Sequence, residues 1–156
     1  MPDNFDLIYF DMNVYNRLFD DQRQTRIRLE TEAINMIFGL FDKNVYTLAW
    51  SFILEDENNN NPFLERKSYI KMMAKLCDVI IEPSDNILAT AKHIMSVSNA
   101  KPKDALHISC AVEYGAKFFI SCDDKLIKTL KLNNSKWNKS GIKTLNPIDF
   151  IRNEVI

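Results

Sequence analysis

The sequence lacks the features that define several common classes of protein. Its 156 residues contain no apolar run long enough to span a bilayer. The first six residues, MPDNFD, carry acids instead of the basic segment and apolar core of an export signal. There are only three glycines, and no glycine-rich phosphate loop, GxSxG motif or HExxH motif occurs. These absences predict a cytoplasmic protein with no membrane partner, and they exclude three familiar catalytic centres.

Cysteine is also scarce. The three cysteines, Cys77, Cys110 and Cys122, lie in helix-like or strand-like segments and show no paired spacing. An odd number of cysteines in a chain without an export signal predicts buried thiols, not disulfides or a zinc site.

Charge is nearly balanced overall but unevenly distributed. The net charge is −1, so the whole molecule has no electrostatic bias toward nucleic acid. Residues 125–143 nevertheless contain six lysines and no acid, and Trp137 lies among them. A basic segment with an aromatic side chain can hold a nucleic-acid strand by phosphate contact and stacking. The alternative is a solvated loop whose tryptophan packs against the domain.

The length and the hydrophobic pattern predict one α/β domain over residues 1–156. The hydrophobic content of 46% and the charged content of 26% are those of a globular protein. Short apolar runs predict strands at residues 7–10, 45–50, 79–81, 118–120 and 142–145. Helical patterns separate them, at residues 22–41, 63–77, 85–97, 105–114, 125–130 and 148–154, with a short helix after Ser51 and a loop at 58–61. Alternating strands and helices predict a three-layer α/β domain with a mostly parallel sheet.

The stretch from residue 101 to 128 places acids at both ends of a helix–strand unit. Asp104 lies beside Pro102 at the expected helix start, and Gly115 supplies the left-handed conformation that a helix exit needs. Asp123 and Asp124 directly follow the buried strand at 118–120. In open α/β sheets, ligands bind at the carboxyl ends of the strands. The sequence therefore predicts a site at that edge.

Two further segments bring carboxylates to the same edge. Asp11 follows the first strand, and Glu55 or Glu57 lies on the short helix after the second. Acids gathered in this way repel one another unless a cation neutralises them, and Mg²⁺ or Mn²⁺ suits carboxylate oxygens. Such an ion can activate a water molecule and stabilise charge on a phosphodiester.

Four short motifs resemble those of the PIN-domain nucleases, in the order and secondary-structure context of that family. Asp11 is followed two residues later by Asn13. The second acid, Glu57, lies six residues after a serine that follows the second strand. The third motif is KDALHI with Asp104 as its acid, and the fourth is SCDDKL with Asp123 as its acid.

The resemblance covers almost the whole chain and implies both a fold and an activity. It implies a PIN-like three-layer α/β/α domain with a central, mostly parallel sheet of four to five strands. It implies an endoribonuclease in which four acids bind Mg²⁺ or Mn²⁺: Asp11, Glu57, Asp104 and Asp123. A metal-activated water would then attack the RNA, leaving 3′-hydroxyl and 5′-phosphate ends. Small bacterial proteins of this kind resemble the toxins of VapBC-type toxin–antitoxin pairs, so an antitoxin protein and a second copy of the chain are candidate partners.

Several assignments have alternatives. A non-catalytic PIN-fold module that binds RNA or protein is the rival function, and Glu55 is the rival to Glu57. Asn13 fits either a hydrogen bond to the metal site or a local cap. Asp124 fits the cap of the next helix or a supporting acid. His107 fits a general base, although a packed histidine that orients neighbouring groups is favoured. A haloacid-dehalogenase-type phosphotransferase is disfavoured because its strand-one motif needs an acid where Asn13 stands.

Overall fold

The computed structural model describes residues 5–156 and contains a five-stranded, all-parallel sheet. Each strand is a short, mostly buried apolar segment, as expected for strands covered on both faces. The strands are β1 (Asp6–Phe10), β2 (Tyr46–Ser51), β3 (Val79–Ile81), β4 (Phe118–Ile120) and β5 (Lys143–Leu145). All five lie where the hydrophobic runs predict them, to within one residue at each end.

The strand order is β3-β2-β1-β4-β5, so the chain leaves β1 toward one side of the sheet and later returns on the other. Phe10 of β1 pairs with Ile120 of β4, and the Asp11 N–H donates to the Ile120 carbonyl at 2.9 Å. The reversal of strand order between β1 and β4 creates a crevice at the carboxyl ends of these strands, which is where such sheets bind ligands.

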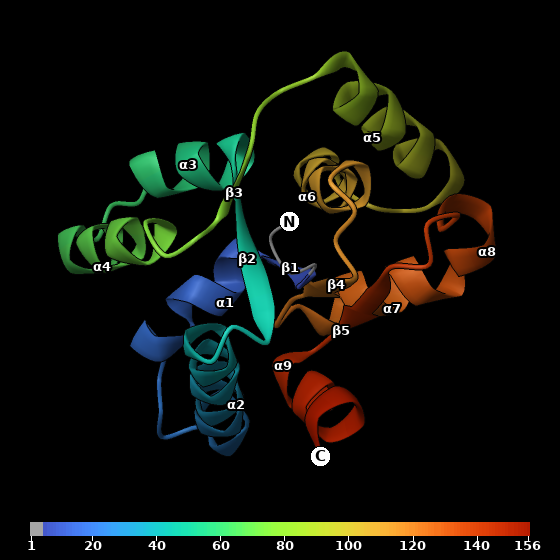
Figure 1. The fold of residues 1–156 in the computed structure, drawn as a ribbon. Helices are drawn as coiled ribbons and strands as arrows, with labels where there is room; N and C mark the ends of the chain where they lie inside the picture. The colour runs from blue at the N-terminus through green and yellow to red at the C-terminus, as the bar shows by residue number, and fades with distance from the viewer. Residues whose placement is uncertain (1–4) are drawn as a thin grey trace.

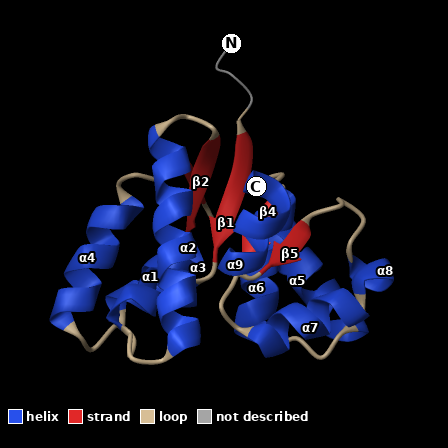
Figure 2. Cartoon of the chain, turned by 90° about the horizontal axis from the view of Figure 1, so that it is seen from below, coloured by secondary structure: helices blue, strands red, loops and turns tan. Residues whose placement is uncertain are grey.

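Helices cover both faces of the sheet (Figure 1). They are α1 (Met12–Asn16), α2 (Thr25–Asp42), α3 (Phe52–Asn59), α4 (Leu64–Ala74), α5 (Asp85–Val97), α6 (Pro102–Glu113), α7 (Asp124–Leu132), α8 (Asn134–Trp137) and α9 (Pro147–Phe150). A 3₁₀ turn (Arg17–Phe19) follows α1, and a π-helical turn (Ile151–Val155) continues α9. Helices α2 and α9 pack together, and α5 packs on α6. Figure 2 shows the chain entering β1 at one end of the sheet, with α6 and α7 gathered toward the other.

The helix boundaries agree with the sequence pattern where capping residues mark them. Ser51 caps α3 through its Oγ, and Ser84 caps α5 in the same way. Gly115, two residues beyond α6, has the left-handed φ of 73° that its position predicts.

Three expectations about burial or helix extent are wrong. The loop expected at 58–61 is in part the last turn of α3, which extends to Asn59, and the buried Asn58 amide donates to the Lys67 carbonyl at 3.1 Å. The helical pattern at 63–77 makes Leu64 available for burial, but Leu64 is 79% exposed at the start of α4. The helical pattern at 22–41 places Glu30 off the apolar stripe, but Glu30 is fully buried and paired with Arg17 and Arg26.

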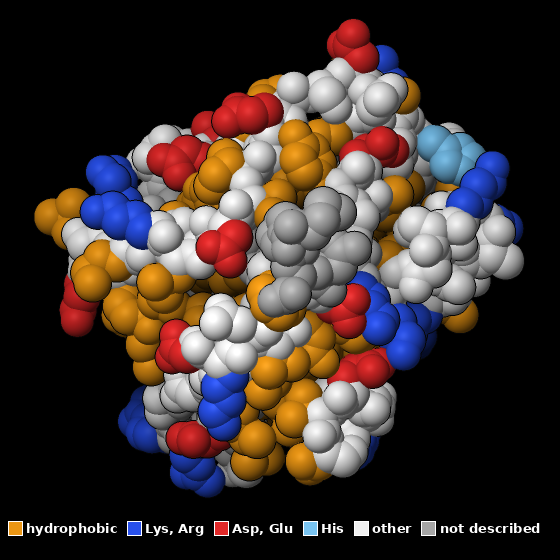
Figure 3. Space-filling view, viewed as in Figure 1, with side chains coloured by type: hydrophobic (Ala, Val, Ile, Leu, Met, Phe, Trp, Pro, Cys, Tyr) orange, Lys and Arg blue, Asp and Glu red, His pale blue; other side chains and the backbone are white. Residues whose placement is uncertain are grey.

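Exposed apolar side chains gather around α4. Phe63, Leu64, Met72 and Leu76 are all exposed, and hydrophobic atoms reach the surface over this helix in Figure 3. Within residues 5–156, no helix has both the length and the apolar character needed to cross a membrane.

Candidate functional site

The carboxyl edge of the sheet forms a pocket that collects all four predicted acids. Asp11, Glu57, Asp104 and Asp123 line one cavity of about 560 Å³. The acids come from four separate segments: the end of β1, helix α3, the start of α6 and the end of β4. The parallel register of β1 with its neighbours β2 and β4 explains why these distant segments meet here.

Asp11 is the most buried of the four acids, with 7% of its surface exposed. Its Oδ1 accepts the Met12 N–H at 2.8 Å, and its Oδ2 accepts the Ser121 hydroxyl at 2.8 Å and the Asn13 amide at 3.1 Å. Asn13 also accepts the Cys122 N–H at 2.9 Å, which joins the first motif to the fourth. Burial raises the pKa of Asp11 despite these hydrogen bonds and the nearby His107.

Asn13 was expected either to hydrogen-bond within the metal site or to act as a local cap. The structure places it between Asp11 and Ser121, and the residue that caps α1 is Asp11 itself.

Glu57 is held by a buried hydrogen-bonded chain. Its Oε1 contacts His107 Nε2, and His107 Nδ1 lies 2.6 Å from the Tyr9 hydroxyl, which is in turn 2.6 Å from Ser51 Oγ. A carboxylate only accepts hydrogen bonds, so Nε2–H donates to Glu57, and in the neutral imidazole Nδ1 accepts from Tyr9. Burial raises the pKa of Tyr9 well above its usual value, which keeps the phenol protonated as this chain requires. His107 therefore orients Glu57, the role that the sequence favoured over general base.

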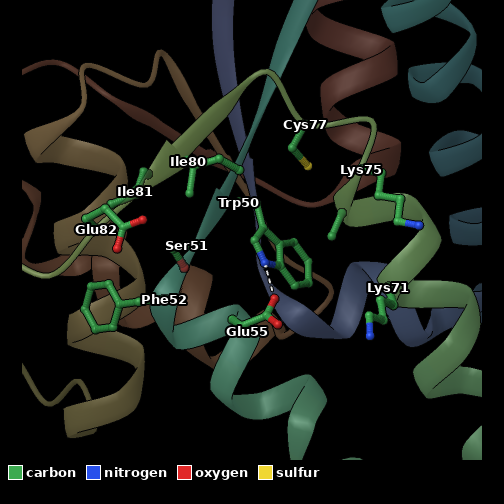
Figure 4. Close-up of a pocket in the computed structure, with 11 residues that line it drawn as sticks. Trp50, Ser51, Phe52, Glu55, Lys71, Lys75, Cys77, Ile80, Ile81 and Glu82 are labelled. Carbon is green, nitrogen blue, oxygen red and sulfur yellow. Dashed lines mark hydrogen bonds between the residues drawn. The ribbon is translucent and has the colours of Figure 1, made fainter.

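The rival acid Glu55 points elsewhere. Its Oε2 accepts the Trp50 indole N–H at 2.8 Å, and it lines a different pocket, beside β3 and α4 (Figure 4). Two residues along a helix turn a side chain by about 200°, so Glu55 and Glu57 face different sides of α3.

Asp104 lies in the first turn of α6, whose cap is Lys101, so it is not the N-cap. It is partly buried, and burial raises its pKa. The negative charges of Asp11 and Asp123 raise that pKa further. Asp104 is therefore in the electrostatic field of two of the other acids.

The helix that follows β4 is capped by Asp123 and not by Asp124. The backbone is still extended at Asp123, so Asp123 is the N-cap of α7, and its Oδ1 accepts the Leu126 N–H at 3.1 Å. Of the two roles considered for Asp124, that of helix cap is wrong, because Asp124 is the first helical residue and forms an ion pair with Arg26. Asp123 lines the acid pocket and Asp124 does not.

The donor set suits a hard divalent ion, although the acids stand apart. Among residues 5–156, no group of three or more histidine, cysteine or acidic side chains is close enough to hold a metal ion. Mg²⁺ and Mn²⁺ prefer carboxylate oxygens and retain several waters, so few direct protein ligands are needed. Burial is the main cause of the raised pKa values of Asp11 and Asp104, and neighbouring carboxylates raise both further. Side-chain rotation would have to bring the acids closer around such an ion.

Sequence reasoning missed Tyr9, which lies at the centre of the hydrogen-bonded chain that supports Glu57. The run at 7–10 predicts a buried strand, and a tyrosine hydroxyl in such a strand needs a hydrogen-bond partner. That signal points to a buried polar network but does not identify Ser51 and His107 as its members. Those partners depend on how β1, β2 and α6 pack together.

Trp137 and His93 lie away from the acid pocket. Trp137 is buried, and its indole N–H donates to the Leu130 carbonyl at 2.8 Å, so it packs against the domain as the alternative reading had it. His93 is exposed on α5, and its Nε2 lies 3.3 Å from the Lys136 carbonyl oxygen of α8, so it links two helices outside the acid pocket.

Comparisons with known proteins identify a structural neighbour. No protein-family model matches this chain, and no curated protein is similar to it in sequence. The chain is similar in structure to one in the crystal structure of VapBC2 from Rickettsia felis bound to a DNA fragment from their promoter. The TM-score is 0.62 at 15% sequence identity, and the match covers 90% of this chain and 98% of that one. At this identity the match shows the fold, which is the PIN-like α/β/α architecture predicted from the sequence motifs.

Proposed function

We propose that the chain is a divalent-metal-dependent endoribonuclease acting in the cytoplasm. The observation that carries the proposal is the convergence of Asp11, Glu57, Asp104 and Asp123 on one pocket at the switch point of the sheet. These residues would hold one or two Mg²⁺ or Mn²⁺ ions. A bound ion of this kind supplies an activated water and neutralises charge on the phosphodiester.

The chain's own residues would prepare this pocket for the reaction. Ser121 and Asn13 fix the orientation of the Asp11 carboxylate, and Met12 adds a backbone N–H. His107 occupies one oxygen of Glu57 and leaves the other for a ligand. Water would be the nucleophile, so no side-chain nucleophile is required, and the products would carry 3′-hydroxyl and 5′-phosphate ends.

The chain would act as the toxin of a type II toxin–antitoxin pair. Two observations support this role: the four motifs resemble those of VapBC-type toxins, and the fold matches a chain in the VapBC2 structure. An antitoxin protein would then be the partner that restrains the nuclease, and a second copy of the chain is a further candidate partner.

A second candidate is a PIN-fold module that binds RNA or a partner protein without cutting. One observation favours it: in residues 5–156, no three side chains that could bind a metal ion lie close enough together to hold one. The intact set of four acids argues against it, because a binding module gains nothing from mutually repelling carboxylates.

Cleavage of a mixed RNA pool tests the proposal. The protein is incubated with Mg²⁺, with Mn²⁺ and with chelator, beside the variants Asp11→Asn and Asp104→Asn. The proposal expects cleavage that needs metal and disappears in both variants. Asp124→Asn is the matched control, because this acid is adjacent to Asp123 but pairs with Arg26 outside the pocket. RNA binding without cleavage under all conditions would favour the non-catalytic module.

A further inference from the structure

The pocket of the four acids has a second group of lining residues, contributed by the loop between α3 and α4 and by the first turn of α4. Asn60, Asn61, Phe63 and Arg66 all line the cavity. The described lining residues include five carboxylates, those of the four predicted acids and Asp20, but a single cationic side chain, Arg66. A phosphate entering this pocket would therefore meet one positive charge from the protein, and its position is fixed by the fold.

Arg66 is held in place yet only loosely paired. Its Nη2 donates to the Phe19 carbonyl at 2.9 Å, and its guanidinium carbon lies 4.9 Å from the centre of the Phe63 ring. The nearest acid is Asp20, at 3.6 Å from Nη1. Asp20 already has a closer partner in Arg17, at 2.9 Å, so Arg66 can exchange this contact for a phosphate at small cost.

Phe63 presents an aromatic ring beside this cation. The ring is 58% exposed, although it lines the pocket, and its backbone N–H donates to Asn61 Oδ1 at 3.1 Å. This hydrogen bond shapes the turn that leads into α4. An exposed ring next to an arginine is the combination that binds single-stranded nucleic acid, because a base stacks on the ring while the cation binds the backbone.

We propose that Phe63 and Arg66 form a nucleotide subsite that selects single-stranded RNA. An unpaired base stacks on the Phe63 ring, and Arg66 binds a phosphate next to the bond that is cut. A base inside a duplex is already stacked on both faces and is not available to the ring. The subsite rests on the proposed nuclease function and specifies its substrate class.

Binding of a short RNA that contains 2-aminopurine tests the stacking interaction. The assay uses the Asp104→Asn background with Mg²⁺, so that cleavage does not interfere and one negative charge leaves the pocket. Stacking on Phe63 quenches the fluorescence of the probe. Phe63→Ala should lose the quenching and weaken binding of the single strand about tenfold, whereas Phe63→Trp should retain both.

Leu64→Ala is the matched control, because Leu64 is adjacent and more exposed but does not line the pocket. It should leave binding unchanged. Arg66→Gln should weaken binding and reduce the slope of log affinity against log salt by about one, as expected for the loss of one phosphate contact. In the cleavage assay with Asp104 intact, Phe63→Ala should raise KM for single-stranded RNA with little change in kcat.

Three results would overturn the subsite. The first is unchanged quenching in Phe63→Ala, the second is equal losses for Phe63→Ala and Leu64→Ala, and the third is equal weakening of single-stranded and duplex RNA. If the protein with intact acids still shows metal-dependent cleavage, such a result refutes the subsite alone. A protein that neither binds nor cuts any RNA refutes the proposed function and the subsite together.

Discussion

Two buried carboxylates in this molecule, Asp11 and Glu30, have contrasting surroundings. Glu30 is fully buried, with Arg17 Nη2 at 3.2 Å and Arg26 Nε at 3.8 Å, and it accepts the Asn146 amide. Asp11 is nearly as buried, but the groups that hydrogen-bond to it are neutral, namely a serine, an asparagine and a backbone N–H, and His107 Nε2 lies 3.9 Å from its Oδ1.

The difference distinguishes a structural acid from a candidate binding acid. Glu30 has its counter-charges supplied by the protein, and its network links α2 to the 3₁₀ turn and to the loop before α9. Asp11 has hydrogen bonds that fix its orientation but no lysine or arginine in contact among the described residues, and burial raises its pKa. An acid that is oriented and buried without a protein cation is suited to receive a cation from solution.

The largest expected effect is the loss of cleavage in Asp11→Asn. We expect the rate to fall about a thousandfold, the order of magnitude for removing one group that stabilises charge in a transition state. Cleavage of a defined RNA in Mg²⁺ provides the measurement. The control is Asp6→Asn, at the opposite end of β1, where Asp6 pairs with Lys117 at 3.1 Å. Comparable activity in the two variants would remove Asp11 from the catalytic set.

Replacement of Glu30 should affect stability more than chemistry. Glu30→Gln leaves two arginines without their buried partner and should lower the free energy of unfolding by about 3 kcal/mol. Urea denaturation measures this change, and Glu32→Gln, on an exposed side of the same helix, should alter stability far less. Equal stability of the two variants would mean that the Glu30 network contributes nothing to the fold.

Replacement of His107 should have an intermediate effect, through Glu57. His107→Gln removes the side chain that orients Glu57 and should weaken Mn²⁺ binding about 10- to 100-fold. The metal affinity is measured by calorimetry alongside the cleavage rate. Tyr9→Phe, one step further along the hydrogen-bonded chain from Glu57, should cause a smaller loss of Mn²⁺ affinity. A larger effect of Tyr9→Phe than of His107→Gln would contradict this order.

The smallest expected effect is a gain in the stability of Asp104→Asn when no metal is present. Because folding raises the pKa of Asp104, its contribution to stability is present below its unfolded pKa and is lost as the pH rises through the folded value. In chelator at neutral pH, Asp104→Asn should therefore stabilise the protein. Since Asp104 is partly exposed, solvent screening limits the gain to about 0.5 kcal/mol.

Thermal melting as a function of pH measures this gain, which should vanish below about pH 4, where the acid is protonated in both states. Added Mg²⁺ should stabilise the wild type more than the variant. A variant that is less stable than the wild type in chelator at neutral pH would contradict the repulsion among the acids.

The sequence predicted the elements of the fold better than the partners of individual side chains. Short apolar runs predicted all five strands of the described residues, and the four acids that the motifs single out line one pocket. Helical periodicity did not reveal that Glu30 is buried, because a charged residue is placed on the solvent side unless its partners are known. Of the partners of Glu30, Arg26 lies on the same helix, but Arg17 and Asn146 lie in other segments of the chain. Ser121, which binds Asp11, and His107, which binds Glu57, are likewise distant in sequence. The register of β1 with β4 and the docking of α6 create these contacts, and neither is visible in local sequence.

Calorimetric titration with Mn²⁺ tests most directly whether the acid pocket receives a cation. We expect the wild type to bind Mn²⁺ with measurable heat, and we expect Asp11→Asn and Glu57→Gln to abolish or strongly weaken the binding. Glu55→Gln, two residues away on α3 and directed at Trp50, should bind as the wild type does. Binding that survives in Asp11→Asn and Glu57→Gln, or is lost equally in Glu55→Gln, would contradict the account, as would the absence of binding in the wild type.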